Sequence, residues 1–417
     1  MAESNDTPEP ISAFVGIDWA DAKHDIYLHP ADGSTASHEV IDAKPEALHD
    51  WILKMREHFS AAGKIYVCLE QSKGALIHQL MQYDFFVLYP INPKTLARFR
   101  EAFRPSGAKD DRSDADLLCE LVRLHTHRLR PWKPDDEQTR KLNAFCQNRR
   151  QAVGSAVRLL QQVREQLKLY YPLALELELN TVLACDFLQR WPTLEELRQA
   201  KPQTIRKFFY AHNFRRGDKI EQFVQKLQKQ TPVTSDRAII EPAAMQVRLL
   251  AAQLRVILNS IPEFDQTIAK IFHSHPDAAI FESFPSAGPQ LAPRLLTAFG
   301  TDRDRLESAE QMSVISGVAP IKIASGKSFA THKRWACPKF IRQSFHEFAG
   351  CSIKFCAWAK AFYQAQRDKN KGHHTAVRAL AFKWMRILFA CWKNRKPYDD
   401  ALYTGALKKR GSAFASP

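Results

Sequence analysis

The sequence predicts an α/β domain at its N-terminus, a long helical middle region and a mainly helical C-terminal part. Short β-branched runs alternate with helical spacing in the first quarter of the chain. Two long stretches in the middle repeat apolar residues every three or four positions. An amphipathic run over 376–392, AVRALAFKWMRILFACW, is expected to close the core of the C-terminal part.

The N-terminal elements follow one another in a recognisable order. ISAFVGID and HDIYLHP, within 11–30, read as a hairpin, and HEVI at 38–41 as a third strand. Helical spacing covers 45–60, KIYVCLE at 64–70 is a strand, a helix starts at 74, and FFVLYPI at 85–91 is the last strand. Three antiparallel strands followed by alternating helices and strands match the ribonuclease-H-like (RuvC-like) layout.

After PWKP at 131–134, which reads as a linker, two apolar heptad series indicate helices that pack along a seam. The first series is Leu142, Cys146, Val153, Ala156, Leu160, Val163, Leu167 and Tyr170; the second is Val247, Leu250, Leu254, Ile257, Ile261, Phe264, Ile268 and Ile271. These series fit both an antiparallel pair of helices within one chain and a coiled coil that joins two chains into a dimer. Pro262 is expected to kink or interrupt the second helix.

These patterns divide the chain into three expected domains. Residues 1–130 form the α/β domain, 131–275 a helical coiled-coil region, and 276–417 the C-terminal domain. The coiled-coil region contains a mainly helical insert, roughly 178–230, that is rich in Lys and Arg. A solvated basic face is the default interpretation of that insert, and contact with nucleic acid is the alternative.

The overall charge favours a polyanionic partner. The chain carries 60 Lys+Arg against 45 Asp+Glu, a net charge of +15, and such side chains bind phosphates by releasing counterions. The eight cysteines form no C-x-x-C pair, so we expect free thiols in a reducing cytoplasm and no zinc ribbon. With no apolar run approaching ~20 residues, no membrane span is expected.

Four carboxylates stand where a sheet would gather them. Asp18 ends the first strand and Glu70 the fourth, and the ends of these strands are adjacent in a ribonuclease-H-like sheet. Asp111 and Asp114, at i and i+3 of a helix start, share one helix face and can join the same pocket.

Crowded carboxylates repel one another unless a cation neutralises them. Hard oxygen ligands select Mg²⁺ or Mn²⁺ over zinc, and two such ions ~4 Å apart suit phosphodiester chemistry. Singly, Asp18 reads as a turn residue, and Asp111 and Asp114 as helix first-turn charges. As an ordered set, the four acids indicate a metal site. Three neighbouring acids make it ambiguous which carboxylates bind the metal: Asp21, Asp110 and Asp116.

In these residues the chain resembles the DEDD transposases of the insertion-sequence one-ten family, the bridge-RNA-guided recombinases. GID ending at Asp18, CLE ending at Glu70, YPINP at 89–93 and KDDRSDA at 109–115 follow the N-terminal pattern of that family in order. The family pattern K-x-D-x-x-D-A implies that its last two acids are Asp111 and Asp114.

The C-terminal part resembles the serine transposase domain of the same family. SFPSAGPQLAPRLLTAFG at 283–300 corresponds to its P-G-x-G segment, with Ser286 where a glycine is common. SGVAPIKIASGKS at 316–328 corresponds to the stretch that holds its catalytic serine, which the resemblance places at Ser325. KRWACPKFIRQSFHEFA at 333–349 and the YD near 398 are similar too.

The resemblance implies an activity with several partners. Ser325 would attack a DNA phosphate and become linked to the DNA, assisted by Mg²⁺ at Asp18, Glu70, Asp111 and Asp114. The two sites would come from different protomers of a homo-oligomer, a dimer or tetramer. A structured guide RNA would direct the enzyme to element ends and target DNA at the bacterial nucleoid.

Two other functions stay open on the residues alone. A Mg²⁺-dependent junction nuclease would use water as its nucleophile, and Ser325 would be incidental. A non-catalytic nucleic-acid-binding protein would carry the four acids as inert groups. The basic residues around Ser325 would stabilise phosphate charge or simply contact DNA; they are Lys322, Lys327, Lys333, Arg334, Lys339 and Arg342.

Overall fold

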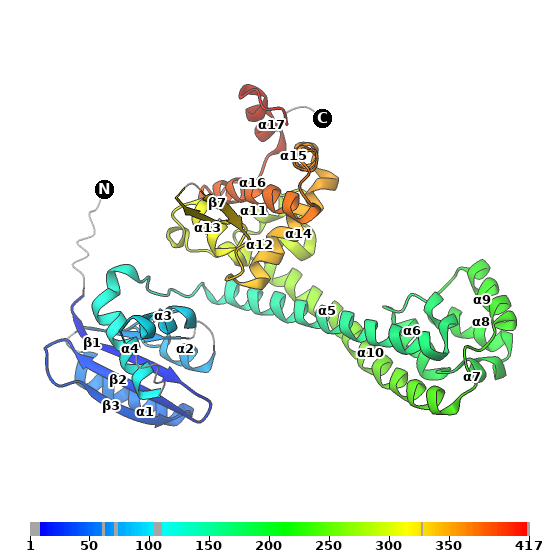
Figure 1. Ribbon diagram of the computed structural model, residues 1–417, viewed down its shortest axis with the longest axis horizontal. Coiled ribbons are helices and arrows are strands. Elements are labelled where there is room, and N and C mark those ends of the chain that lie inside the picture. The colour runs from blue at the N-terminus through cyan, green and yellow to red at the C-terminus, as the bar shows by residue number, and fades with distance from the viewer. Residues whose placement is uncertain (1–8, 61–62, 71–73, 104–110, 327, 415–417) are drawn as a thin grey trace. The chain divides into compact units, whose positions relative to one another are not determined.

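The structure, a computed structural model, describes residues 9–60, 63–70, 74–103, 111–326 and 328–414, with the side chains of Ser60 and Asp111 left out. The chain forms two compact units, Met1–Pro134 and Asp135–Pro417. Each unit has its own core, and each is described by itself below (Figure 1).

Unit 1 is built on a five-stranded mixed sheet of order β3-β2-β1-β4-β5. The first three strands are antiparallel, while β4 runs parallel to both β1 and β5. This confirms the three leading antiparallel strands and the adjacency of the first and fourth strands. The strands are β1 (Ile11–Trp19), β2 (Lys23–Pro30), β3 (Ser37–Asp42), β4 (Lys64–Leu69) and β5 (Phe86–Pro90).

Helices cover both faces of this sheet. One face packs Val15, Ile17 and Val67 against α1 (Pro45–Met55), which a π-helical turn, η1 (Arg56–Ser60), extends, and α2 (Ala75–Leu80). On the other face, Cys68 and Tyr89 pack against α3 (Pro93–Phe103) and α4 (Asp111–His125), which ends in the 3-10 turn η2 (Thr126–Arg128). The alternation of side chains along β1 and β4 therefore divides their residues between two cores.

Gly16 allows α4 to lie directly on β1. A Cβ atom at this position would stand 1.9 Å from the Ala115 carbonyl oxygen and 2.4 Å from the Cys119 backbone nitrogen. The Cys119 thiol also donates a hydrogen bond of 3.3 Å to the Phe14 carbonyl. Only glycine permits this backbone-to-backbone approach.

Unit 2 contains an arm of two long antiparallel helices, α5 (Glu137–Tyr170) and α10 (Arg237–His273). Gln138, in the first turn of α5, donates to the Ile271 carbonyl near the end of α10. Midway, the Arg149 Nη2 donates to Asp265 at 3.1 Å. Of the two interpretations of the heptad series, the structure has the pair within one chain.

The arm is continuous at Pro262, so of the two expected outcomes, a kink or an interruption of the second helix, the interruption does not occur. α10 runs from Arg237 to His273 with Pro262 inside it. Proline removes one backbone hydrogen bond, but Phe264 and Ile268 beyond it still pack into the core at the base of the arm. Side-chain burial on the following turn keeps the helix going.

A small helical bundle forms the tip of the arm, after a 3-10 turn, η3 (Pro172–Glu176). In its core, Phe187 packs edge-to-face against Phe208 and Phe223 and at a tilt against Phe209, with ring centroids 5.8–6.2 Å apart. The helices of the tip are α6 (Val182–Arg190), α7 (Leu194–Gln199), α8 (Pro202–Ala211) and α9 (Gly217–Lys229).

The C-terminal part of unit 2 is mainly helical. Its core is closed by α16 (His373–Lys393), as the apolar spacing of that run predicted, with Trp384 and Trp392 fully buried. The other elements are α11 (Ala278–Glu282), α12 (Gly288–Phe299), η4 (Arg303–Arg305), α13 (Ala309–Ile315), β6 (Ile321–Ser325), β7 (Ser328–His332), α14 (Lys339–Phe355), α15 (Ala357–Arg367) and α17 (Asp400–Lys409).

All eight cysteines are free thiols, as the sequence predicted. Burial raises the pKa of the Cys146 thiol to about 12 and that of Cys185 to about 11. These thiols act as small apolar side chains of the cores. Among the described helices, none combines the length and apolarity needed to traverse a bilayer.

We expect Gly16→Ala to loosen unit 1 because its methyl group would overlap the backbone of α4. Overpacking of this kind costs about 1–3 kcal/mol. Amide hydrogen exchange of peptides from β1 and α4 should accelerate about tenfold. Gly405→Ala is the control, since a Cβ there meets nothing within 4 Å. Equal exchange in the two variants would contradict the role assigned to Gly16.

A second prediction concerns Asp136, which caps α5. Burial raises its pKa, but hydrogen bonds from the Thr139 side chain and backbone and from Thr301 outweigh this and lower it from 3.8 to about 2. The stabilisation is therefore complete above the ordinary pKa and is lost as the pH falls through the folded pKa.

Asp136→Ala should lower the free energy of unfolding by about 1 kcal/mol near neutral pH, a value that allows for solvent screening of this exposed residue. The difference from the parent should shrink towards about pH 2 in urea unfolding experiments. Glu263→Ala, at an exposed position of α10, should show no such pH dependence. A constant deficit for Asp136→Ala at all pH values would disprove the ionic role.

Candidate functional site

Asp18 and Glu70 lie side by side at one edge of the sheet in unit 1. The parallel register pairs Ile17 of β1 with Leu69 of β4, so Asp18 and Glu70 are the next residues on the two strands. Both are half-buried. The register thus brings together the two acids that the sequence placed at the ends of the first and fourth strands.

Both acids belong to the sheet face that α4 covers. Gly16, two residues before Asp18, lies under the backbone of Ala115, and Cys68, two residues before Glu70, packs against α4. Residues two apart on a strand point to the same face. α4 starts at Asp111 and runs antiparallel to β1, because Ala115 lies at Gly16 and Cys119 at Phe14. Its N-terminal turn therefore lies at the edge where the strands end.

Asp114 is buried in that N-terminal turn, with 4% of its surface exposed. The Arg100 side chain of α3 holds its carboxylate: Nε donates to Oδ1 at 2.8 Å, and Nη2 donates to the same oxygen. A buried carboxylate needs such a partner, because an uncompensated charge in the interior costs several kcal/mol. The sequence analysis missed Arg100, and no spacing rule would have singled it out.

Asp25 is a further acid that the sequence analysis missed. It stands opposite Asp18 in the antiparallel β1–β2 register and is 4% exposed. The His38 Nε2 lies 2.9 Å from its Oδ1, and the Lys23 ammonium 3.6 Å from Oδ2. A charged residue at an inward position of a β-strand was the available signal.

For Asp111, only the position of the backbone can be compared with the expected set of four acids. Asp111 begins α4, while its side chain, like the whole of Asp110, lies outside the described residues. Among the side chains that are described, no three of the His, Cys, Asp or Glu type are grouped closely enough to hold a metal ion. What the structure places on one face is therefore Asp18, Glu70 and the start of α4.

These donors fit Mg²⁺ or Mn²⁺ by their chemistry. All are carboxylate oxygens, which hard divalent cations prefer. The Arg100 guanidinium already lies beside the Asp114 carboxylate, so this site accommodates a positive charge next to one of its acids.

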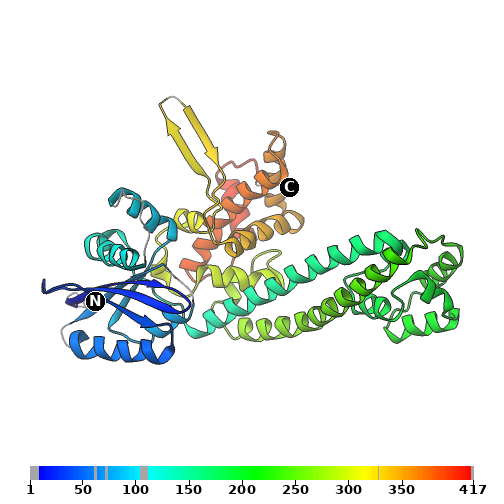
Figure 2. The same ribbon diagram turned by 60° about the horizontal axis from the view of Figure 1, so that its bottom comes forward.

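Ser325 lies on an exposed hairpin of unit 2. It ends β6, pairs with Ser328 of β7, and is followed by Gly326 with a φ of +54°, the left-handed backbone that such a tight turn requires. Figure 2 shows this ribbon, in yellow, projecting away from the helices of unit 2. In the described part of the chain the Ser325 hydroxyl has no hydrogen-bond partner.

The two faces of the hairpin differ in chemistry. Alternation along the strands puts Ser325, Ser328 and His332 on one face, and Lys322 and Phe329 on the other. Phe329 is 64% exposed, and from 311 to 346 the sequence contains no Asp or Glu. An aromatic side chain on an acid-free, basic ribbon is suited to nucleic acid.

Ser286 has the backbone geometry of the glycine that it replaces. Its φ is +69°, in the region that favours glycine, and its hydroxyl donates to the Cys351 carbonyl at 3.3 Å. Gly288, two residues on, has a φ of +52° and begins α12. The PSAG turn thus holds Ser286 in a backbone region that favours glycine, with a side-chain hydrogen bond to the Cys351 carbonyl.

Comparison with known proteins identifies the family on both parts of the chain. The family model of the DEDD transposases of IS110 matches residues 15–172. A second model, described as the transposase IS116/IS110/IS902 family, matches residues 278–364. The first match contains Asp18, Glu70, Asp111 and Asp114, and the second contains Ser325.

Individual relatives agree with these matches. A putative transposase for the mini-circle IS117 of Streptomyces coelicolor is 26% identical over 407 residues, which is 94% of this chain and 96% of the relative. An uncharacterized 42 kDa protein of the insertion element IS900 of Mycobacterium paratuberculosis is 24% identical, covering 75% and 78%. A putative transposase of Sinorhizobium fredii is 30% identical, covering 49% and 58%. The chain belongs to the IS110 family of transposases, enzymes that act on DNA.

Proposed function

We propose that this transposase cuts and rejoins DNA with two chemical groups, a divalent-metal site in unit 1 and the hydroxyl of Ser325 in unit 2. The observation that carries the proposal is the convergence of Asp18, Glu70 and the N-terminal turn of α4 on one face of the sheet. Unit 1 would be a ribonuclease-H-like (RuvC-like) domain, whose first and fourth strands carry acids in this way.

Asp18, Glu70, Asp111 and Asp114 would hold Mg²⁺ or Mn²⁺. When bound, the metal supplies positive charge that stabilises the phosphate oxygens of the substrate. Arg100 has a positioning role, because its guanidinium fixes the Asp114 carboxylate at the start of α4. Gly16 sets the distance between that helix and the strands.

Ser325 would be the nucleophile. Its Oγ forms a bond to a DNA phosphorus, the phosphorus bond to a deoxyribose oxygen breaks, and the hydroxyl proton passes in net to the departing oxygen. The exposed position of Ser325 on the hairpin supports this role, because a phosphodiester can reach it. A second transfer in reverse would join the new DNA partner and free the serine.

By resemblance to the family, the carboxylates of one subunit would act together with Ser325 of another, so the enzyme would be a homo-oligomer. A structured RNA encoded beside the gene would guide it to element ends and target. The net charge of +15 is compatible with both nucleic acids. We also propose that the chain divides into three domains, with boundaries at about residues 130 and 275.

The nucleophile can be tested by a matched pair of serine variants. Ser325→Ala should abolish the covalent protein–DNA adduct and strand exchange, a loss of at least about a thousandfold. Ser328→Ala, its partner across the hairpin, should retain both. Adducts are detected on denaturing gels with end-labelled element DNA, Mg²⁺ and the flanking transcript. Cleavage without adduct in both parent and variant would favour the water-dependent nuclease.

The metal site can be tested with Glu70→Gln, which keeps the side-chain shape but removes the charge. It should weaken Mn²⁺ binding about tenfold or more and lower Mg²⁺-dependent cleavage by about a hundredfold. Glu57→Gln, an exposed acid of the same unit, is the control. Calorimetric titration with Mn²⁺ separates binding from activity, and unchanged binding in Glu70→Gln would remove Glu70 from the ligand set.

A further inference from the structure

The tip of the arm lies outside both family matches, which cover 15–172 and 278–364. Its helices α6 to α9 pack on their own aromatic core at the end of α5 and α10 (Figure 1). α5 contacts the C-terminal part of unit 2 as far as Arg150, which donates to Gln343, and its remaining residues to Tyr170 extend about 30 Å beyond it. The proposed cutting and rejoining of DNA does not by itself explain why a helical bundle lies at the end of the arm.

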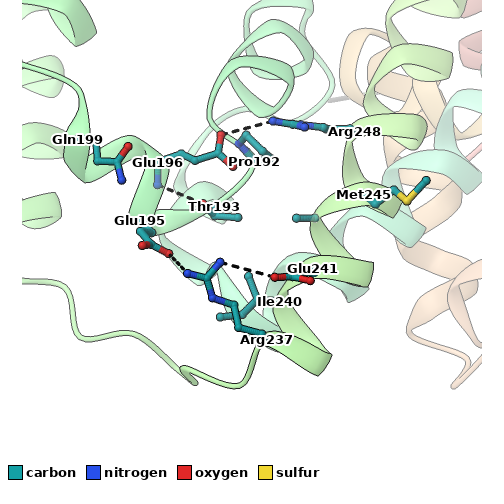
Figure 3. Close-up of a pocket in the computed structure, with 11 residues that line it drawn as sticks. Pro192, Thr193, Glu195, Glu196, Gln199, Arg237, Ile240, Glu241, Met245 and Arg248 are labelled. Carbon is teal, nitrogen blue, oxygen red and sulfur yellow. Dashed lines mark hydrogen bonds and ion pairs between the residues drawn. The ribbon is translucent and has the colours of Figure 1, made fainter.

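The acids on the arm side of the tip are used in ion pairs. In the pocket between α7 and α10, Arg237 pairs with Glu195 at 3.3 Å, and Arg248 with Glu196 at 3.4 Å (Figure 3). The pocket has a volume of about 430 Å³, and its charged groups face one another. It is a structural contact between the tip and the arm.

Three further acids of the tip are also neutralised. Asp186 accepts from Arg255 at 2.7 Å and lies 2.9 Å from the His212 Nε2. Glu221 receives two hydrogen bonds from Arg206, at 2.6 and 2.7 Å. Glu176 pairs with Lys226 at 2.9 Å. These pairs leave a surplus of cations on another part of the tip.

That surplus gathers at the turn between α8 and α9. Lys207 lies one turn before the end of α8, Arg215 and Arg216 are in the turn, and Lys219 is in the first turn of α9; all four are exposed. Within the described residues none of them has an ion-pair partner. Asp218, beside Lys219, is the nearest acid in sequence.

We use the name tip patch for the exposed residues around this turn: Lys207, Tyr210, Arg215, Arg216 and Lys219. Asn213 adopts a φ of +60° that reverses the chain, and its side-chain oxygen accepts from Arg215 at 3.4 Å. The Tyr210 hydroxyl lies 3.6 Å from where a Cβ would stand on Gly217, so the end of α8 meets the start of α9. Tyr210 is 42% exposed.

The start of α9 adds to the positive potential of the tip patch. Arg216 occupies the N-cap position and no side chain caps the helix. The free N–H groups of the first turn and the helix dipole favour an anion there. An exposed tyrosine among cations can pack against a sugar or phosphate group.

We propose that the tip patch binds the phosphate backbone of duplex DNA that flanks the site of strand exchange. The partner is DNA because the family acts on DNA, and backbone contacts fit this surface because it offers cations and N–H groups in place of base-reading amides. The arm would thus hold flanking DNA away from the C-terminal part of unit 2.

The experiment compares full-length variants on duplexes of two lengths. Arg215→Glu/Arg216→Glu and Lys219→Glu alter the tip patch. Lys229→Glu makes the same charge change as Lys219→Glu at the exposed far end of α9, about 15 Å from Lys219. Fluorescein-labelled random-sequence duplexes of about 40 and about 12 base pairs serve as probes, since backbone contacts do not depend on sequence. Circular dichroism checks that each variant is folded.

We expect the double variant to bind the long duplex about tenfold more weakly than the parent, with the slope of log K against log salt reduced by about one for each lost contact. Lys229→Glu should match the parent, and the short duplex should show little difference. Equal binding by all variants, or equal loss in Lys229→Glu, would overturn the proposal. Loss confined to the flanking RNA transcript would also overturn it, and would assign the patch to RNA.

These outcomes are independent of the nucleophile. A tip-patch variant that binds long DNA poorly should still form the serine adduct at low salt, if Ser325 is the nucleophile. Failure of Ser325→Ala to abolish the adduct would leave the result for the tip patch unaffected. The two proposals can therefore fail separately.

Discussion

The close approach of α4 to β1 at Gly16 is the constraint on which the candidate site depends. Without a side chain at this residue, the backbone of Ala115 rests on the strand, and the first turn of α4 reaches the edge where Asp18 and Glu70 end their strands. A larger residue would lift the helix by at least part of a side-chain diameter. The first turn of α4 would then lie farther from the sheet edge that carries Asp18 and Glu70.

Electrostatics at this edge follow from the same packing. Burying Asp114 and Asp25 in one small region is costly, and the chain meets the cost with Arg100 on one acid and His38 with Lys23 on the other. Asp18 and Glu70 are half-buried at the same edge, so solvent reaches them more easily than it reaches Asp114 and Asp25.

Much of unit 1 could be predicted from the sequence because period-two runs and their order determine a sheet. The end positions of Asp18 and Glu70 then follow from strand adjacency.

Arg100 and Asp25 could not be predicted, since their roles depend on tertiary neighbours that no spacing encodes. The partner of the α5 seam was likewise open, because an apolar stripe does not state which helix it meets. Pro262 does not interrupt α10, since packing on both sides outweighs one lost hydrogen bond. Ser325 was located through resemblance, and its exposure on the hairpin is compatible with that role; burial in a core would have excluded it.

The hairpin that carries Ser325 has only two strands, and solvent reaches both of its faces. Isolated ribbons of this kind are marginally stable in water. Among the described residues, the Ser325 hydroxyl forms no hydrogen bond. If Ser325 is the nucleophile, as we propose, DNA that binds the hairpin would both hold it rigid and complete the surroundings of the hydroxyl. Such conditional reactivity would protect the host chromosome from breakage by unassembled enzyme.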